Sequence, residues 1–148
     1  MIDRKFIGVR KPLRKIEVEK YPLRLFSKAI GEISPIYSNE EAARSAGFRS
    51  IVVPPTYLFC LETMAEAIGP DVDLGIDYSK ILHGEQFFTY HNIACAGDAL
   101  VFDAHIADIY DKKGGALEFI VTDTAVTDSA GGKVADLRFV LAVKGGEG

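Results

Sequence analysis

The sequence predicts an α+β domain in which a curved antiparallel sheet wraps around one long central helix. Three observations predict it. Helical patterns are confined to the first half of the chain, strand patterns fill the second half, and residues 56–68 are apolar around most of a helical circumference. Helices segregated from strands are typical of α+β folds, and a helix that is apolar nearly all round is expected to be buried.

Length and composition indicate one globular domain over residues 1–148, with a tail at 145–148 that we expect to be frayed. Hydrophobic residues make up 48% and charged residues 26%, a balance that argues against disorder. The formal net charge of −4 disfavours a general affinity for nucleic acids or anionic membranes. Near the N-terminus, an excess of basic residues fits either a solvated face or attraction of a phosphate-bearing ligand. These residues are Arg4, Lys5, Arg10, Lys11, Arg14 and Lys15.

The sequence favours a cytoplasmic location. It has no secretory leader pattern and no apolar run of the roughly 20 residues that a membrane-spanning helix needs. Its two cysteines, Cys60 and Cys95, fit a reducing compartment and lack the spacing of a zinc site, so we expect no metal. Cys60 lies within the apolar helical stretch and is expected to be a buried thiol.

The first half contains three helical patterns. After a weak alternation over residues 11–19, which predicts a short strand or extended arm, residues 20–30 predict a helix that ends at Gly31. A short helix follows, with Asn39 as its N-cap and Gly47 at its end. The prolines in the stretch at 51–55 favour an extended backbone. The apolar helix at 56–68 comes next and stops at Gly69-Pro70.

The second half predicts four antiparallel strands in a meander. The strands cover residues 82–92, 99–111, 117–128 and 133–143, and the last three are joined by Gly-rich turns at 112–115 and 129–132. The outer face of this sheet is only half polar, which suggests oligomerisation through the sheet. A sheet wrapped around a central helix is the hot-dog fold, which is the fold that we expect.

Two stretches resemble the MaoC-like dehydratase family. Residues 29–37 (Ala-Ile-Gly-Glu-Ile-Ser-Pro-Ile-Tyr) are similar to its active-site loop, Gly-Asp-x-Asn-Pro-x-His. Residues 82–91 (Leu-His-Gly-Glu-Gln-Phe-Phe-Thr-Tyr-His), with Ala-Gly-Asp at 96–98, resemble its N-terminal-type branch. The resemblance implies a dimer of hot-dogs that handles enoyl or (R)-3-hydroxyacyl thioesters of coenzyme A or acyl carrier protein. It implies no cofactor.

The reaction implied by the resemblance is reversible addition of water to the enoyl double bond. It needs a carboxylate and an imidazole five positions apart to hold a water and move its protons. It also needs a backbone N–H at the start of the central helix to stabilise the enolate oxygen. In this chain Glu32 stands at the Asp position, and Tyr37, whose phenol is a poor base at neutral pH, stands at the His position. Pro55, which has no N–H, stands at the usual Gly position.

We therefore expect a component of an (R)-specific enoyl-CoA hydratase or 3-hydroxyacyl dehydratase, with this chain as the substrate-accommodating half. Its partner would be a second hot-dog subunit that carries Asp and His, in a homodimer or a heterodimer. The alternatives are a non-catalytic acyl-CoA-binding or scaffolding subunit, or a self-sufficient hydratase that uses Glu32. A thioesterase would need a carboxylate on the central helix, but we expect Glu62 and Glu66 to face solvent.

The candidate catalytic residues are Glu32, Tyr37 and His83, and the candidate substrate-binding residues are Pro55, Thr56, Tyr57, Glu85 and Gln86. Glu32 could instead cap its own loop, and Tyr37 could pack with its hydroxyl in water. His83 could form a polar cluster with Glu85 and Gln86 near the acyl chain, or make only local hydrogen bonds. His91 and His105 have no partner that is evident from the sequence.

Overall fold

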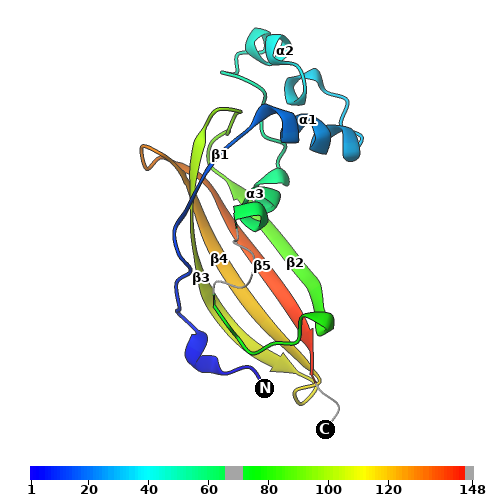
Figure 1. The fold of residues 1–148 in the computed structure, drawn as a ribbon, viewed down its shortest axis with the longest axis vertical. Coiled ribbons are helices and arrows are strands. Elements are labelled where there is room, and N and C mark those ends of the chain that lie inside the picture. Colours follow the sequence, from blue (N-terminus) through cyan, green and yellow to red (C-terminus); the bar gives the residue numbers. More distant parts are fainter. Residues whose placement is uncertain (66–71, 146–148) are drawn as a thin grey trace.

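The computed structural model describes residues 1–65 and 72–145, built on one five-stranded antiparallel sheet in the order β1-β3-β4-β5-β2 (Figure 1). The strands are β1 (Arg14–Glu17), β2 (Ile81–Tyr90), β3 (Ala99–Lys112), β4 (Leu117–Asp128) and β5 (Lys133–Lys144). The α-helices are α1 (Lys20–Ala29), α2 (Glu40–Ser45) and α3 (Tyr57–Ala65). Short 3-10 helices are η1 (Arg4–Phe6), η2 (Pro35–Tyr37) and η3 (Tyr78–Lys80). The α+β hot-dog fold is confirmed.

The helices pack at one end and on one face of the sheet. α1 and α2 lie together beyond one end of the strands, whereas the N-terminus and the end of β5 lie near the other end (Figure 1). α2 begins as expected, because the Asn39 side chain accepts a hydrogen bond from the Ala42 N–H at 2.9 Å. Gly31 and Gly47 follow α1 and α2 with positive φ angles of 72° and 93°, a conformation that glycine adopts without strain.

The expected four-strand meander is wrong in one respect. Only β3, β4 and β5 follow one another across the sheet, whereas β2 pairs with β5 at the far edge, with Ile81 opposite Val143 and Tyr90 opposite Ala135. The connection from β2 to β3 therefore passes over β5 and β4. A bridge between Val52 and Cys95 anchors it. Hydropathy records which face of a strand is buried but not which strand lies beside it, so the meander that we expected assigned β2 the wrong neighbour.

The core lies between α3 and one face of the sheet. Leu58 and Leu61 of α3 are 2% and 4% exposed and join one buried cluster with Leu100 and Phe102 of β3 and Leu137 of β5. Burying each such side chain stabilises the fold by about 1.5–3 kcal/mol. A second cluster, which includes Ile106, Ile109 and Ile120, is covered by Ile2 of the N-terminal arm.

The prediction that α3 is buried nearly all round is wrong for part of its surface. Thr63 is exposed, and Met64 is 65% exposed. Glu62, which we expected in solvent, is half-buried and accepts a hydrogen bond from the Thr124 hydroxyl of β4. Glu62 faces the sheet because Thr124, which is 3% exposed, needs a polar partner, and the Glu62 carboxylate provides one.

Other parts of the helix prediction have mixed outcomes. Cys60 is half-buried rather than buried, because part of its side of α3 is open, whereas Cys95 is buried. The end of the expected helix at 66–68, which includes Glu66, lies outside the described residues. So do its expected stop at Gly69-Pro70 and the last three residues of the expected tail. Within the described residues, none of the helices is long and apolar enough to cross a bilayer.

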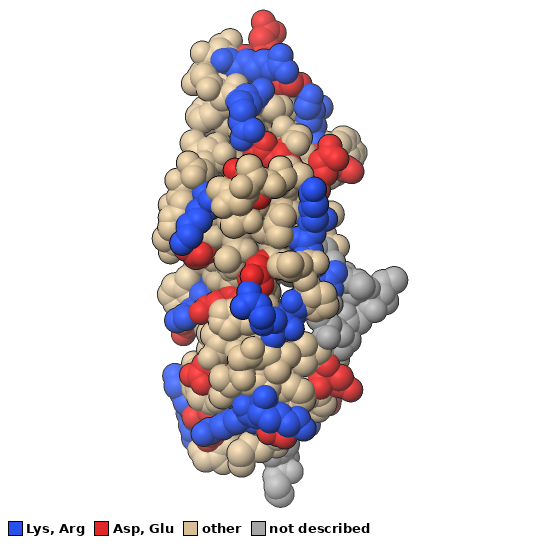
Figure 2. Space-filling view, turned by 90° about the vertical axis from the view of Figure 1, so that its left-hand side faces the viewer, with Lys and Arg blue, Asp and Glu red and all other residues tan. Residues whose placement is uncertain are grey.

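The N-terminal arm runs along the outer edge of β3, held by backbone hydrogen bonds and ion pairs. Arg4 pairs with Asp111 at 3.1 Å, and Arg10 pairs with Asp103. Figure 2 shows Lys and Arg side chains interspersed with Asp and Glu on this side of the molecule. These contacts support the interpretation of the basic residues as a solvated, partly neutralised face. Exposed pairs of this kind contribute about 0–1 kcal/mol each.

Candidate functional site

An apolar pocket of about 250 Å³ lies at the start of α3, between η2, the end of β2 and residues 92–94. Its apolar wall includes Ile36, Phe48, Val53, Pro54, Leu58 and Val134. Four residues with polar side-chain groups also line it: Tyr37, Tyr90, His91 and Asn92. A mostly apolar pocket with a few polar groups is the usual form of a small-molecule site.

The start of α3 is fixed by the extended segment before it. Val53 donates its N–H to the Ala94 carbonyl at 2.9 Å, and Tyr57 donates to the Pro54 carbonyl at 2.9 Å as the helix begins. The Pro55 carbonyl accepts a hydrogen bond from the Tyr90 hydroxyl. Because desolvation raises the pKa of Tyr90 to about 12, this phenol keeps its proton at neutral pH and remains a donor. The contact ties the start of α3 to the end of β2.

Tyr37 and Pro55 meet at this pocket, as the resemblance implied for the positions that they occupy. η2 carries Tyr37, whose backbone carbonyl accepts a hydrogen bond from the Ser27 hydroxyl at 3.2 Å. The Tyr37 side chain is half-buried, and no described residue hydrogen-bonds to its hydroxyl. Pro55 provides no N–H at the start of the helix. The position of the family's imidazole is thus taken by a phenol, and Pro55 supplies no backbone donor at the start of the helix.

Glu32 does not line the pocket. It is exposed in the loop after α1, and its carboxylate accepts a hydrogen bond from the Ser34 N–H at 2.8 Å. Its own N–H donates to the Ser27 carbonyl at 2.9 Å. This geometry is that of a side chain that caps and orients its own loop.

His83 and Glu85 lie on opposite faces of β2. The His83 ring packs against Phe59 of α3 and Phe139 of β5, with ring centroids 5.3 and 4.8 Å apart. A register shift between His83 and Glu85 interrupts the alternation of β2, so that Glu85 points to the outer face of the sheet. The cluster of His83, Glu85 and Gln86 that the sequence suggested is therefore not formed.

The remaining candidates also lie outside the pocket wall. Thr56 is exposed at the turn into α3, and Tyr57 is 5% exposed and packs on Phe26 at 4.9 Å between ring centroids. Gln86 is half-buried, and its side-chain oxygen is buried without a hydrogen-bond partner among the described residues. Tyr57 is thus a core residue, and desolvation raises the pKa of its phenol.

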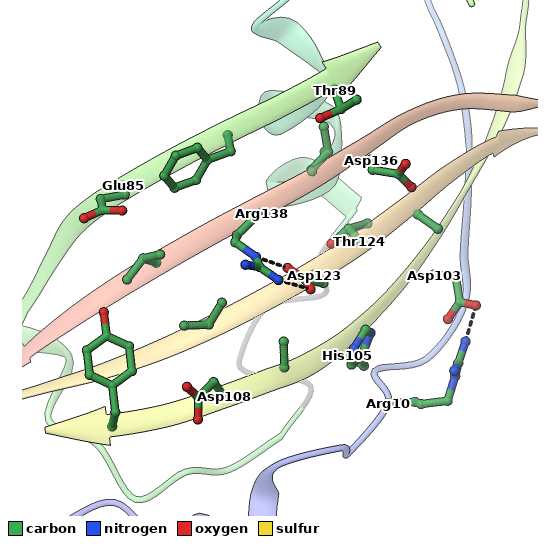
Figure 3. Close-up of a pocket in the computed structure, with 17 residues that line it drawn as sticks. Arg10, Glu85, Thr89, Asp103, His105, Asp108, Asp123, Thr124, Asp136 and Arg138 are labelled. Carbon is green, nitrogen blue, oxygen red and sulfur yellow. Dashed lines mark hydrogen bonds and ion pairs between the residues drawn. The ribbon is translucent and has the colours of Figure 1, made fainter. Parts of the chain in front are cut away.

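A wider groove of about 980 Å³ crosses the outer face of the sheet (Figure 3). Arg138 makes a two-point ion pair with Asp123 at 2.6 and 2.7 Å, which lowers the pKa of that carboxyl. Arg10 pairs with Asp103 at the edge, and Glu85 lines the groove from β2. The labelled acids outnumber the two arginines, so the groove disfavours a phosphate-bearing ligand. The apolar pocket is therefore the better candidate site.

His91 also lines the pocket, although the sequence indicated no partner for it. It follows β2, where its N–H donates to the Val134 carbonyl at 2.9 Å. Its Nε2 lies 2.6 Å from an Asp136 carboxylate oxygen on β5. The two residues are 45 positions apart in the chain, and only the pairing of β2 with β5 brings them together. No local pattern could have revealed the contact. Within the described chain, no group of His, Cys, Asp and Glu could hold a metal ion.

Comparisons with known proteins agree with this architecture. The family model "FAS1-like, dehydratase domain region" matches residues 5–137. A UPF0336 protein of Saccharopolyspora erythraea is 34% identical over 146 residues, which cover 97% of this chain and 92% of the relative.

Solved structures are similar in fold. A chain of the HadBC (3R-hydroxyacyl-ACP dehydratase) complex from Mycobacterium tuberculosis superposes with a TM-score of 0.78 at 24% identity, covering 93% of this chain and 96% of that one. The MaoC-like dehydratase from Rhodospirillum rubrum has a TM-score of 0.71 at 16% identity, with 95% and 94% covered. The family model matches most of this chain, which shows that the chain belongs to the FAS1-like dehydratase-region family, with the hot-dog fold of MaoC-like dehydratases.

Proposed function

We propose that this chain is a subunit of an (R)-specific enoyl-thioester hydratase or 3-hydroxyacyl dehydratase. It accommodates the acyl chain, and a second hot-dog subunit supplies the Asp and His that move protons. One observation carries the proposal: the apolar pocket at the start of α3 has Tyr37 and Pro55 where the family places an imidazole and a backbone donor.

The pocket supports binding of an acyl chain better than catalysis by this chain alone. Each methylene that leaves water for an apolar wall contributes about 0.8 kcal/mol. A phenol such as that of Tyr37 is a poor acceptor of a proton from water at neutral pH. Glu32 is exposed outside the pocket and is occupied by the Ser34 N–H. The pocket thus offers apolar surface without the paired acid and base of the family loop.

The edge of the sheet supports a partner subunit. Among the described strands β2 pairs only with β5, so its other edge is not paired by any of them and suits addition of a further strand. Leu82, Phe87 and Tyr90 on this strand are 49%, 52% and 44% exposed. A second copy of this chain would bring another Glu32 and Tyr37, whereas a different hot-dog subunit could bring Asp and His. The similar HadBC structure is itself a complex.

The test compares the isolated chain with a reconstituted pair. Alone, the chain should not hydrate crotonyl-CoA; co-expressed with a hot-dog subunit from a neighbouring gene that carries Asp and His five apart, it should form a complex that does. Replacing the partner's Asp by Asn should abolish turnover while the complex stays intact on a sizing column. Robust hydration by the isolated chain would refute the division of roles.

The second candidate function is a non-catalytic acyl-CoA-binding or scaffolding subunit. The same pocket, taken without a catalytic partner, favours it. This alternative predicts binding of acyl-CoA by calorimetry and no turnover in any pairing. Activity in the reconstituted pair that also requires this chain would exclude it.

A further inference from the structure

We propose that His91, oriented by Asp136, is the hydrogen-bond acceptor for the 3-hydroxyl group of an acyl thioester in the apolar pocket. It is a specificity-determining residue, and Asp136 is its positioning residue. This inference rests on the proposed function, because it requires an acyl chain in that pocket.

His91 is held in place before any ligand binds. Its backbone N–H donates to the Val134 carbonyl at 2.9 Å, and the Asn92 N–H donates to the same carbonyl at 3.2 Å. The His91 side chain lines the pocket and is 33% exposed, so most of the imidazole is covered by protein. Because hydrogen bonds fix its main chain and Asp136 contacts its ring, His91 loses little freedom when a ligand arrives.

Asp136 selects the orientation and tautomer of the ring. Its carboxylate lies 2.6 Å from Nε2 of His91, and it stands on the outer face of β5 (Figure 3). A carboxylate accepts but does not donate, so this contact favours the tautomer that carries its proton on Nε2. The lone pair is then on Nδ1. No described residue hydrogen-bonds to Nδ1.

The other polar groups of the pocket are less suited to this role. The Tyr90 hydroxyl donates to the Pro55 carbonyl, and the Asn92 amide nitrogen donates to the Lys133 carbonyl at 2.7 Å. Among the described residues, none hydrogen-bonds to the Tyr37 hydroxyl or to the Asn92 amide oxygen, but both are weaker acceptors than an imidazole lone pair whose ring is polarised by a carboxylate. In a wall that is mostly apolar, a hydroxyl on the acyl chain needs such an acceptor or loses its bond to water.

The experiment uses two ligands that differ by one hydroxyl group. Isothermal calorimetry of the full chain measures the Kd of (R)-3-hydroxyoctanoyl-CoA and of octanoyl-CoA. The wild type should bind the hydroxylated ligand about fivefold more tightly, the ratio that corresponds to one net hydrogen bond of about 1 kcal/mol. His91→Phe keeps a ring but removes the acceptor, so it should reverse the preference. Asp136→Asn should reduce the preference toward one.

Control variants separate the contact from general damage. His91→Asn retains an acceptor near the position of Nδ1 and should retain part of the preference. This variant also tests the contact if His91→Phe does not fold. His105→Phe changes a histidine of the outer groove and should leave the ratio unchanged.

Each outcome separates the two proposals. Equal affinities in the wild type, or a preference that survives both His91→Phe and Asp136→Asn, would overturn the role of His91 and leave the pocket as an acyl site. If neither ligand binds, the proposed accommodation of the acyl chain is wrong, and the inference about His91 falls with it.

Discussion

Replacing Gly84 by alanine is expected to destabilise the fold, because Gly84 lies where β2 changes register. In the structure, a Cβ added at Gly84 would stand 2.8 Å from the Val140 carbonyl oxygen. Real Cβ atoms essentially never approach so closely, and the obstacle is backbone rather than the end of a flexible side chain. The strand must therefore move away from β5, or the register shift must be lost.

The cost can be bounded from this geometry. Forcing one extra carbon into a well-packed position costs typically about 1–3 kcal/mol. For a protein of about 150 residues, each kcal/mol of destabilisation lowers the Tm by about 2–4 °C. Gly84→Ala should therefore lower the Tm by about 2–12 °C. Loss of the register shift would also bring Glu85 toward α3, where a carboxylate without a partner adds to the penalty.

Thermal unfolding followed by circular dichroism measures the effect. Thr89→Ala, at an exposed position of the same strand, is the matched control and should change stability by no more than about 0.5 kcal/mol. A Gly84→Ala protein that melts within about 1 °C of the wild type would refute the steric argument.

Four further outcomes are expected. In an active reconstituted pair, Glu32→Gln should leave turnover within about twofold, since that carboxylate only caps its loop; a hundredfold loss would instead support the self-sufficient hydratase. Tyr90→Phe should lower the free energy of unfolding in urea by about 0.5–1.5 kcal/mol through loss of its bond to the Pro55 carbonyl. Unchanged stability would argue against that bond. Because desolvation raises the pKa of the Cys60 thiol, the native protein should react slowly with a thiol reagent at pH 8 and rapidly once unfolded; a fast native reaction would contradict this. Arg138 lowers the pKa of Asp123, so their pair stabilises the fold above pH 3.8 and loses that effect as the pH falls through the lower folded value; Asp123→Asn should flatten the acid limb of a stability profile.

Much of the fold could be predicted because its signals are local. The alternation of Leu100, Phe102, Ala104 and Ile106 identifies one face of β3, and all four are buried as expected. Asn39 predicted the start of α2 and caps it in the structure. These features depend on a few neighbouring residues, so the sequence carries them directly.

The features that the sequence missed depend on non-local pairing. Nothing in residues 81–90 reveals that β2 lies beside β5, or that a register shift at Gly84 turns Glu85 outward. The sequence predicted that Glu62 is a solvent-facing charge on a helix, but it contacts Thr124, which is 62 positions away. Each error comes from a contact that forms only when distant segments meet.

The candidate site shows the same division. The resemblance placed Tyr37 and Pro55 in one site, and the structure brings both to the apolar pocket. It brings Glu32 and His83 elsewhere, because a loop cap and a strand bulge control where those side chains point. The structure also brings His91 to this pocket and pairs it with Asp136, which the sequence did not predict.

By itself the sequence determined the secondary structure, the α+β class and the loss of the family's imidazole and of the backbone donor at Pro55. These are properties of residue identity and of short periodic patterns. The tertiary structure decided which side chains share the pocket and which are occupied elsewhere. The physical reason is that convergence at a site depends on strand order and register, which arise when the whole sheet packs against α3.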